Sequence, residues 1–290
     1  MRIAVTADLH WGHNSAGDDA IRLLVQHLRA QPPDLLLLGG DIGTGSHFAS
    51  CLGLFGDFAC PKALVPGNHD LWVNPDDARG DSLQVYQDHL PGLCAAHAFH
   101  YLDRAPLILA QQQLAIVGTI NWYDYSWSLP RLRQQVPDWE ARLQKMAFTR
   151  GRHNDRRFVR WNLDDGRFTQ QIVAAFEHQL ATALGQCERV LILTHHPAFY
   201  GLSFPRLGPT SVPDGLLWDA FSGNTIIEEL LCRHAERIAL IFSGHTHRAR
   251  ANVLEGVRGI NIGGDYHFKR LIELDWPACC VAVHEFGEAC

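Results

Sequence analysis

The chain has 290 residues, of which 47% are hydrophobic and 19% are charged, and its net charge at pH 7 is −6. These values are typical of a globular protein with a large core, and they exclude a disordered, collagen-like or coiled-coil chain. The negative charge argues only weakly against a protein that binds polyanions. No apolar run reaches the roughly 18 residues that a membrane helix needs, so we expect no contact with a membrane.

The N-terminus and the cysteines both favour a cytoplasmic protein. The first ten residues contain one Arg and reach Asp8 without the apolar run of a signal peptide, so they read as the first strand of the fold. The eight cysteines are scattered and form no C-x-x-C pair. This usage is typical of reduced thiols in a cytosol, where cysteine fills the core.

The first third of the sequence alternates strands with amphipathic helices. Strands are predicted at residues 3–7, 35–38 and 63–65, and helices at 19–31 and 46–58. Because sequential parallel strands are joined by right-handed helical crossovers, this order predicts an α/β sheet.

The rest of the chain continues this alternation around an unusual middle. A helix near 82–89 precedes three closely linked strands, which predict an antiparallel portion of sheet. Those strands are 99–103, 107–110 and 114–119; later strands are expected at 190–194, 238–242, 258–262, 269–274 and 281–286, with a helix at 225–235. We find no repeat or linker, and so predict a single domain over residues 1–290 with an Arg- and aromatic-rich helical insertion at about 121–187.

Residues of the types that bind metals follow five of the predicted strands. The five motifs are Asp8-Leu9-His10, Gly40-Asp41, Gly67-Asn68-His69-Asp70, His195-His196 and Gly244-His245-Thr246-His247. The one-residue gap in the first motif puts a carboxylate and an imidazole on one face of a strand. Each motif alone also fits a polar turn. All five in order predict a shared site, because the carboxyl ends of the strands in an α/β sheet converge.

This ordered set resembles the calcineurin-like metallophosphoesterase superfamily, over residues 8–247. The resemblance implies an α/β fold in four layers, a sandwich of two β-sheets flanked by helices, which holds two metal ions. It implies one ion held by Asp8, His10, Asp41 and His247, and a second held by Asp41, Asn68, His195 and His245, with Asp41 as the bridge. His69 would contact the substrate phosphate or the leaving group, and Asp70 would orient the imidazole of His69.

The implied chemistry is metal-dependent hydrolysis of phosphoesters, by a phosphatase or a phosphodiesterase. Nitrogen and oxygen ligands without thiolate favour two divalent ions of Mn, Fe or Zn. A water between two such ions can have a pKa of about 7, which provides a hydroxide that attacks phosphorus in line. His195 and His196 compete for one ligand position. We choose His195, because the superfamily pattern puts the ligand first and because Pro197 restricts His196.

The insertion bears on the substrate. Residues 131–167 contain ten Arg or Lys against five Asp or Glu, interleaved with aromatic residues. Guanidinium groups bind phosphate and aromatic faces stack on bases, which favours a small phosphoester substrate such as a nucleotide. A solvated helical cap with an aromatic underside explains the same composition. Phosphoprotein phosphatases of the superfamily continue Gly-Asp with Asp-Arg-Gly, whereas this chain has Gly40-Asp41-Ile42-Gly43.

Two other functions stay open: a nuclease acting on DNA or RNA ends, and a non-catalytic scaffold with the same fold. A pI near 6.3 does not favour the nuclease. A scaffold would be expected to lack metal ligands, whereas every ligand position here is filled. Further candidates outside the motifs are Asn121, Tyr123 and Asp124, which could face the metals, and Asn261, Asp265 and His267, whose loop could overhang the site. His13 and His47 read as surface residues.

Overall fold

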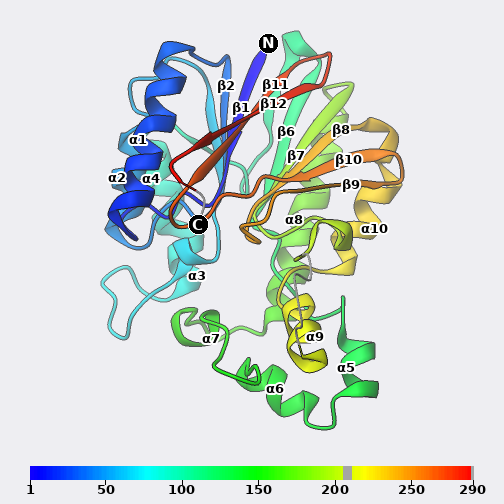
Figure 1. Ribbon diagram of the computed structural model, residues 1–290. Helices are drawn as coiled ribbons and strands as arrows, with labels where there is room; N and C mark the ends of the chain where they lie inside the picture. The colour runs from blue at the N-terminus through cyan, green and yellow to red at the C-terminus, as the bar shows by residue number, and fades with distance from the viewer. Residues whose placement is uncertain (205–210, 289–290) are drawn as a thin grey trace.

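The computed structural model describes residues 1–204 and 211–288. Two six-stranded β-sheets pack face to face, and helices cover the outer side of each sheet (Figure 1). This arrangement confirms the predicted α/β sandwich. Among the described helices, none is long and apolar enough to cross a membrane.

The first sheet contains both the beginning and the end of the described chain. Its order is β12 (Cys280–Phe286), β11 (Lys269–Asp275), β1 (Arg2–Thr6), β2 (Leu35–Gly39), β3 (Lys62–Val65) and β4 (His100–Tyr101). The strands β1 to β4 are parallel, whereas β11 and β12 are antiparallel to their neighbours. Helices α1 (Ser15–Ala30) and α2 (Ser46–Gly53) provide the crossovers that the sequence predicts.

The second sheet contains the middle of the chain. Its order is β5 (Leu107–Leu109), β6 (Leu114–Thr119), β7 (Arg189–Thr194), β8 (Ile238–Ser243), β10 (Val257–Asn261) and β9 (Arg250–Leu254). The four inner strands are parallel, and the two edge strands are antiparallel to them. Helices α8 (Asp165–Leu184) and α10 (Thr225–Arg233) lie on the outer side of this sheet (Figure 1).

The expected antiparallel unit of three short strands is confirmed for its last two strands and wrong for the first. The strand β4 pairs in parallel with β3, and β6 pairs in parallel with β7, so only the β5–β6 hairpin is antiparallel. The tight links are misleading because the chain passes from one sheet to the other between Tyr101 and Leu107. The helix expected near 82–89 is also longer: α3 (Ser82–Gln84) runs through a π-helical turn into α4 (Leu90–Ala96).

Alternating side chains of the inner strands fill two separate apolar layers. In β1, Ile3 and Val5 point into the layer between the sheets, whereas Ala4 points toward the helices. Leu35 and Leu37 of β2 repeat this alternation with their neighbours. Burial on both faces explains why these strands read as continuous apolar runs.

The segment between β6 and β7 divides into two parts. Helices α5 (Leu129–Gln135), α6 (Trp139–Lys145) and α7 (Asp155–Phe158) lie beyond the lower edge of the sheets, together with α9 (Val212–Ala220) (Figure 1). In contrast, α8 packs against β6 and serves as the crossover of the second sheet. The part of the predicted 121–187 insertion that lies outside the sandwich is therefore 121–164. The single-domain organisation stays a prediction.

Substituting Gly118 tests the tight contact between the two sheets. A Cβ atom at this position would lie 2.7 Å from Val65 Cγ1 and 2.9 Å from Leu102 Cβ. We expect Gly118→Ala to lower the free energy of unfolding by about 1–3 kcal/mol, because a packed core has no room for the methyl group. Gly92→Ala in α4, where a Cβ would meet open space, is the matched control. Equal denaturation midpoints for Gly118→Ala and the wild type would contradict this packing.

Candidate metal centre

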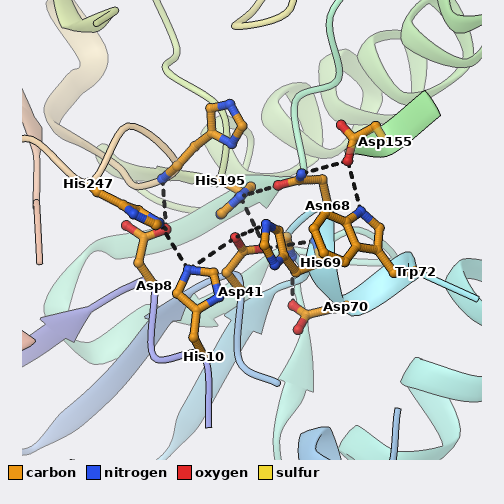
Figure 2. A network of polar contacts seen from close by, with 12 residues as sticks. Asp8, His10, Asp41, Asn68, His69, Asp70, Trp72, Asp155, His195 and His247 are labelled. Atoms are coloured by element: carbon orange, nitrogen blue, oxygen red, sulfur yellow. Dashed lines mark hydrogen bonds and ion pairs between the residues drawn. The ribbon is translucent and has the colours of Figure 1, made fainter. Parts of the chain in front are cut away.

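The five motifs lie at the carboxyl ends of β1, β2, β3, β7 and β8, three strands from one sheet and two from the other. Figure 2 shows that side chains of these motifs converge on one another. Helices α7 and α9 lie beyond the edge of the sandwich at which these strands end (Figure 1). The structure therefore brings together residues far apart in the sequence, such as His10 and His247, which are separated by 237 positions.

One cluster contains two carboxylates and two imidazoles. Asp8, His10, Asp41 and His247 each offer one ligand atom, and these atoms lie within 4.8 Å of one another. His10 Nε2 is 2.9 Å from His247 Nε2 and 3.5 Å from Asp41 Oδ2 (Figure 2). Nitrogen and oxygen donors that face one point in this way could hold a divalent ion.

A second group of donors adjoins the first across Asp41. His195 Nε2 lies 3.1 Å from Asn68 Oδ1 and 3.4 Å from Asp41 Oδ1. The Nδ1–H of His195 donates to the Gly39 carbonyl at 2.9 Å, so the neutral ring presents the lone pair of Nε2 to this group. Asp41 therefore presents a different oxygen to each group, so its carboxylate could be shared between them.

His245 and His196 lie beside His195. The ring centroids of His245 and His195 are 5.3 Å apart. The Nε2 of His245 is buried without a hydrogen-bond partner among the described residues. The ring of His196 is 4.1 Å from that of His245, and its Nδ1 donates to the Ile120 carbonyl. His195 contacts both Asn68 and Asp41, which favours it over His196 for the shared ligand position.

Five of the candidate ligands have an unusual backbone conformation. Asp8, His10, Asp41, His245 and His247 have φ between +48° and +71°. A residue with a Cβ atom adopts this left-handed region at a cost of about 1–3 kcal/mol. Hydrogen bonds between the strand ends hold it: Asp8 N–H donates to the Gly40 carbonyl and His10 N–H to the Asp41 carbonyl, at 3.0 and 2.8 Å. The strained turns aim the side chains at one point.

Asp70 accepts hydrogen bonds from the backbone of the site. Its two carboxylate oxygens accept the backbone N–H groups of Gly43 and Gly67, at 3.0 and 2.8 Å, so it ties two loops of the site together. These contacts hold the loop that carries His69, and the expectation that Asp70 orients the imidazole of His69 stays a prediction. A Cβ at Gly67 would lie 2.1 Å from Asp41 Oδ1, so the close approach of these loops requires glycine there.

His69 is held by aromatic stacking. Its ring lies 3.6 Å from the ring of Trp72 at an interplanar angle of 24°, and Trp72 stacks in turn on Phe158 of α7. The Nε2 of His69 is 3.9 Å from Asp41 Oδ2 (Figure 2). The imidazole therefore has a fixed position beside the candidate bridge.

The protein alone provides too few nearby cations to offset the buried carboxylates of the site. Burial raises the pKa of Asp8 to about 7 and raises that of Asp41 well above its usual range. Burial also lowers the pKa of His195 to about 3 and that of His247 to about 4. Lys269 donates to the Asp8 carbonyl at 3.0 Å, and its own pKa falls to about 8 through burial. Neutral imidazoles and carboxylates without enough cations are the environment that divalent ions complete.

Asp155 is the main site residue that the sequence did not reveal. It begins α7 and is buried, and its Oδ1 accepts the amide of Asn68 and the indole N–H of Trp72, both at 2.8 Å (Figure 2). Its Oδ2 accepts the Tyr123 hydroxyl at 3.1 Å. Because the carboxylate takes the Asn68 amide nitrogen, the Asn68 carbonyl oxygen points toward His195. No motif signals this role, since Asp155 lies in an arginine-rich stretch.

The other candidates outside the motifs have supporting contacts. The Asn121 amide donates to the His196 and Pro197 carbonyls, Tyr123 reaches the site through Asp155, and Asp124 accepts the Ser126 N–H. The Asn261 amide donates to the Gly244 carbonyl at 2.7 Å, Asp265 accepts the His267 N–H, and His267 is exposed. His13 and His47 are exposed, as expected.

The loop after β10 does overhang the site, through a residue that the sequence analysis missed. The ring centroid of Tyr266 lies 4.6 Å from the ring centroid of His10 and 4.9 Å from that of His247. Tyr266 also lines a cavity of about 370 Å³ beside the clusters. Of the arginines in the insertion, Arg150 and Arg152 line this cavity, whereas Arg156, Arg157 and Arg160 line another.

Comparison with known proteins agrees with this geometry. A model of the calcineurin-like phosphoesterase family matches residues 1–249. The chain belongs to this family. Members of the family depend on metal and hydrolyse phosphoesters, although some are not catalytic. No curated protein sequence matches the chain.

Two solved structures share the fold of this calcineurin-like phosphoesterase chain. A phosphopantetheinyl hydrolase from Mycobacterium tuberculosis superposes with a TM-score of 0.69 at 18% identity, over 91% of this chain and 89% of that one. A dimetal phosphatase from Danio rerio superposes with a TM-score of 0.59 at 14% identity, over 99% of this chain and 96% of that one. At these identities, the two structures establish the fold.

Substituting Asp155 tests whether it positions Asn68. We expect Asp155→Ala to weaken metal binding about 10–100-fold, as the loss of a group that orients a metal ligand does elsewhere. Asp155→Asn keeps an oxygen for the Asn68 and Trp72 donors and should bind metal within a few-fold of the wild type. Mn²⁺ titration by calorimetry measures both, and Asp138→Ala, at an exposed carboxylate, is the control. Wild-type affinity in Asp155→Ala would refute the positioning role.

Proposed function

We propose that this protein is a hydrolase of small phosphoesters, monoesters or diesters, that uses two divalent metal ions, and that its substrates are nucleotides. The observation that carries the proposal is the convergence of Asp8, His10, Asp41 and His247 on one point beside a cavity of about 370 Å³. Membership of the calcineurin-like phosphoesterase family supports the reaction class.

The donor set suits Mn, Fe or Zn, because it combines imidazoles with oxygen donors and contains no thiolate. When bound, two such ions would supply Lewis acidity and a water of lowered pKa as the nucleophile. The residues of the chain hold the donor atoms in position. Asp41 offers one oxygen to each cluster, and Asp155 holds the Asn68 carbonyl oxygen toward His195.

His69 has the position that a leaving-group donor requires. It lines the cavity, and stacking on Trp72 fixes its ring. The Nε2–H of the imidazole can donate to the departing oxygen of the substrate, which stabilises or protonates that oxygen as the phosphorus–oxygen bond breaks. The stacking of Trp72 on the imidazole supports a role of Trp72 in orienting His69, beside the role expected of Asp70.

The far wall of the cavity supports a nucleotide substrate. Arg150 and Arg152 provide guanidinium groups for phosphate oxygens. Phe148 and Trp218 stack on each other with ring centroids 4.6 Å apart and present aromatic surface to the same cavity. A cavity of this volume accommodates a small molecule. These features favour a nucleotide over a nucleic acid chain.

A substrate panel tests the proposed function. After chelation and dialysis the protein should be inactive, and Mn²⁺ should restore turnover. Among mononucleotides, cyclic nucleotides, sugar phosphates, a phosphopeptide, single-stranded DNA and a phosphopantetheinyl ester, we expect the highest kcat/KM on a nucleotide. Asp41→Asn serves as the inactive control against contaminating phosphatases.

Each contrary result of the panel has a distinct meaning. Full activity after chelation would refute the metal mechanism. A preference for DNA that falls steeply with salt would replace the proposal with the nuclease. A preference for the phosphopantetheinyl ester or a sugar phosphate would overturn the nucleotide class. Inactivity of the metal-loaded protein on every compound would favour the scaffold.

Replacing His69 tests the proposed leaving-group donor. We expect His69→Ala to retain two ions per chain and to lose about 10²–10⁴ in kcat, the usual contribution of a positioned acid–base group. The loss should be greater for alkyl than for aryl esters, because an aryl oxide leaves with little help. Equal losses would show that His69 only holds the phosphate, and loss of metal would show that it is a ligand. His178→Ala, at an exposed histidine of α8 away from the site, is the control.

A further inference from the structure

A second group of metal-binding side chains lies on the outer, helix-covered face of the first sheet. It consists of His27 in the last turns of α1, Glu273 in β11 and His284 in β12, and their ligand atoms lie within 4.8 Å of one another. The catalytic candidates, in contrast, lie at the carboxyl-end edge of the sandwich. No family motif includes these three residues, which occur in three separate elements.

The strand register explains why these side chains meet. In the β11–β12 pair, Leu271 is opposite His284 and Glu273 is opposite Ala282, so Glu273 and His284 are diagonal neighbours on one face. Leu271 on this face belongs to the apolar layer under the helices. Helix α1 packs on both strands and brings His27 over the pair. The small side chain of Ala282 leaves space opposite the glutamate.

Each imidazole lies from one oxygen of the carboxylate at the separation of neighbouring zinc ligands. His27 Nε2 lies 3.2 Å from Glu273 Oε1, and His284 Nε2 lies 3.2 Å from Glu273 Oε2. Bonds of 2.0–2.1 Å at the tetrahedral angle put neighbouring ligand atoms about 3.3 Å apart. The two imidazole rings are 4.5 Å apart between centroids, so they approach the carboxylate from adjacent directions.

The group is accessible to an ion but shielded on most sides. The side chains of His27, Glu273 and His284 are 19%, 13% and 34% exposed. The ring of Phe286 lies 5.5 Å from that of His27 and closes one side. Three protein ligands would leave one coordination position of Zn²⁺ for a water, as in open zinc sites.

We propose that His27, Glu273 and His284 form a zinc site, separate from the catalytic centre, that fastens the edge strand β12 to helix α1. In the described part of the chain, β12 pairs only with β11. A bound ion would add a link from this edge strand to a helix far away in the sequence. Binding to the folded state alone stabilises it by mass action.

The test compares variants that keep the hydrogen bonds but lose the metal ligands. His27→Gln and His284→Gln can still donate to Glu273, whereas a glutamine amide is a poor ligand for Zn²⁺. In equilibrium dialysis, we expect each variant to bind one Zn²⁺ per chain fewer than the wild type, and Zn²⁺ to raise its Tm less. Mn²⁺-supported activity should equal that of the wild type. His178→Gln, at an exposed histidine of α8, is the control.

Direct observation of the ion provides an independent check. Anomalous diffraction at the zinc edge from wild-type crystals soaked in Zn²⁺ should give a peak between the three side chains. No peak there, or equal Zn²⁺ counts in the wild type and both variants, would show a hydrogen-bonded His–Glu–His group without metal and overturn the proposal. Because these readouts do not require turnover, they are independent of whether the proposed phosphoesterase activity is found.

Discussion

The packing of the two sheets against each other is the constraint on which the candidate centre depends. The apolar layer between the sheets sets their relative position, and both sheets direct the carboxyl ends of their parallel strands to one edge. Asp41 follows a strand of the first sheet and His195 a strand of the second, yet their side chains lie 3.4 Å apart. A small slide of one sheet would separate them. The core therefore determines the site geometry.

The edge of the sandwich that carries the candidate ligands is unfavourable in free energy. It combines left-handed backbone at several non-glycine residues with buried carboxylates that resist ionisation. The stability to maintain it comes from the apolar layers on both sides of each sheet, in which β1 and β2 are almost completely buried. Divalent ions would reverse the electrostatic part of the cost, because they favour the ionised carboxylates and the neutral imidazoles. Such an arrangement is typical of a site selected for chemistry rather than for stability.

The pattern of the sequence predicted the alternating strands and the residues that converge at the edge, because each motif directly follows an apolar strand. The two-sheet fold was implied by the resemblance to the metallophosphoesterase superfamily. The sequence did not predict Asp155 or Tyr266, whose roles depend on how the segment 121–164 and the loop after β10 fold back over the sheets. A buried carboxylate between three donors has no local signature when arginines surround it in the chain. The sequence also did not predict that β4 joins the first sheet and β5 the second, since short links look the same within one sheet and between two sheets.

The pairing of β1 has a consequence for the order in which the protein is made. The strand β1 pairs with β2, which follows shortly, and with β11, which is synthesised about 270 residues later. Until β11 emerges from the ribosome, one side of β1 has no partner, and Asp8 lacks the lysine that binds its carbonyl. Contacts between such distant segments form slowly, because a long loop must close first. The candidate metal-binding edge is therefore assembled near the end of folding, and a nascent chain carries the ligands of the first sheet, Asp8 to Asn68, well before it carries the centre.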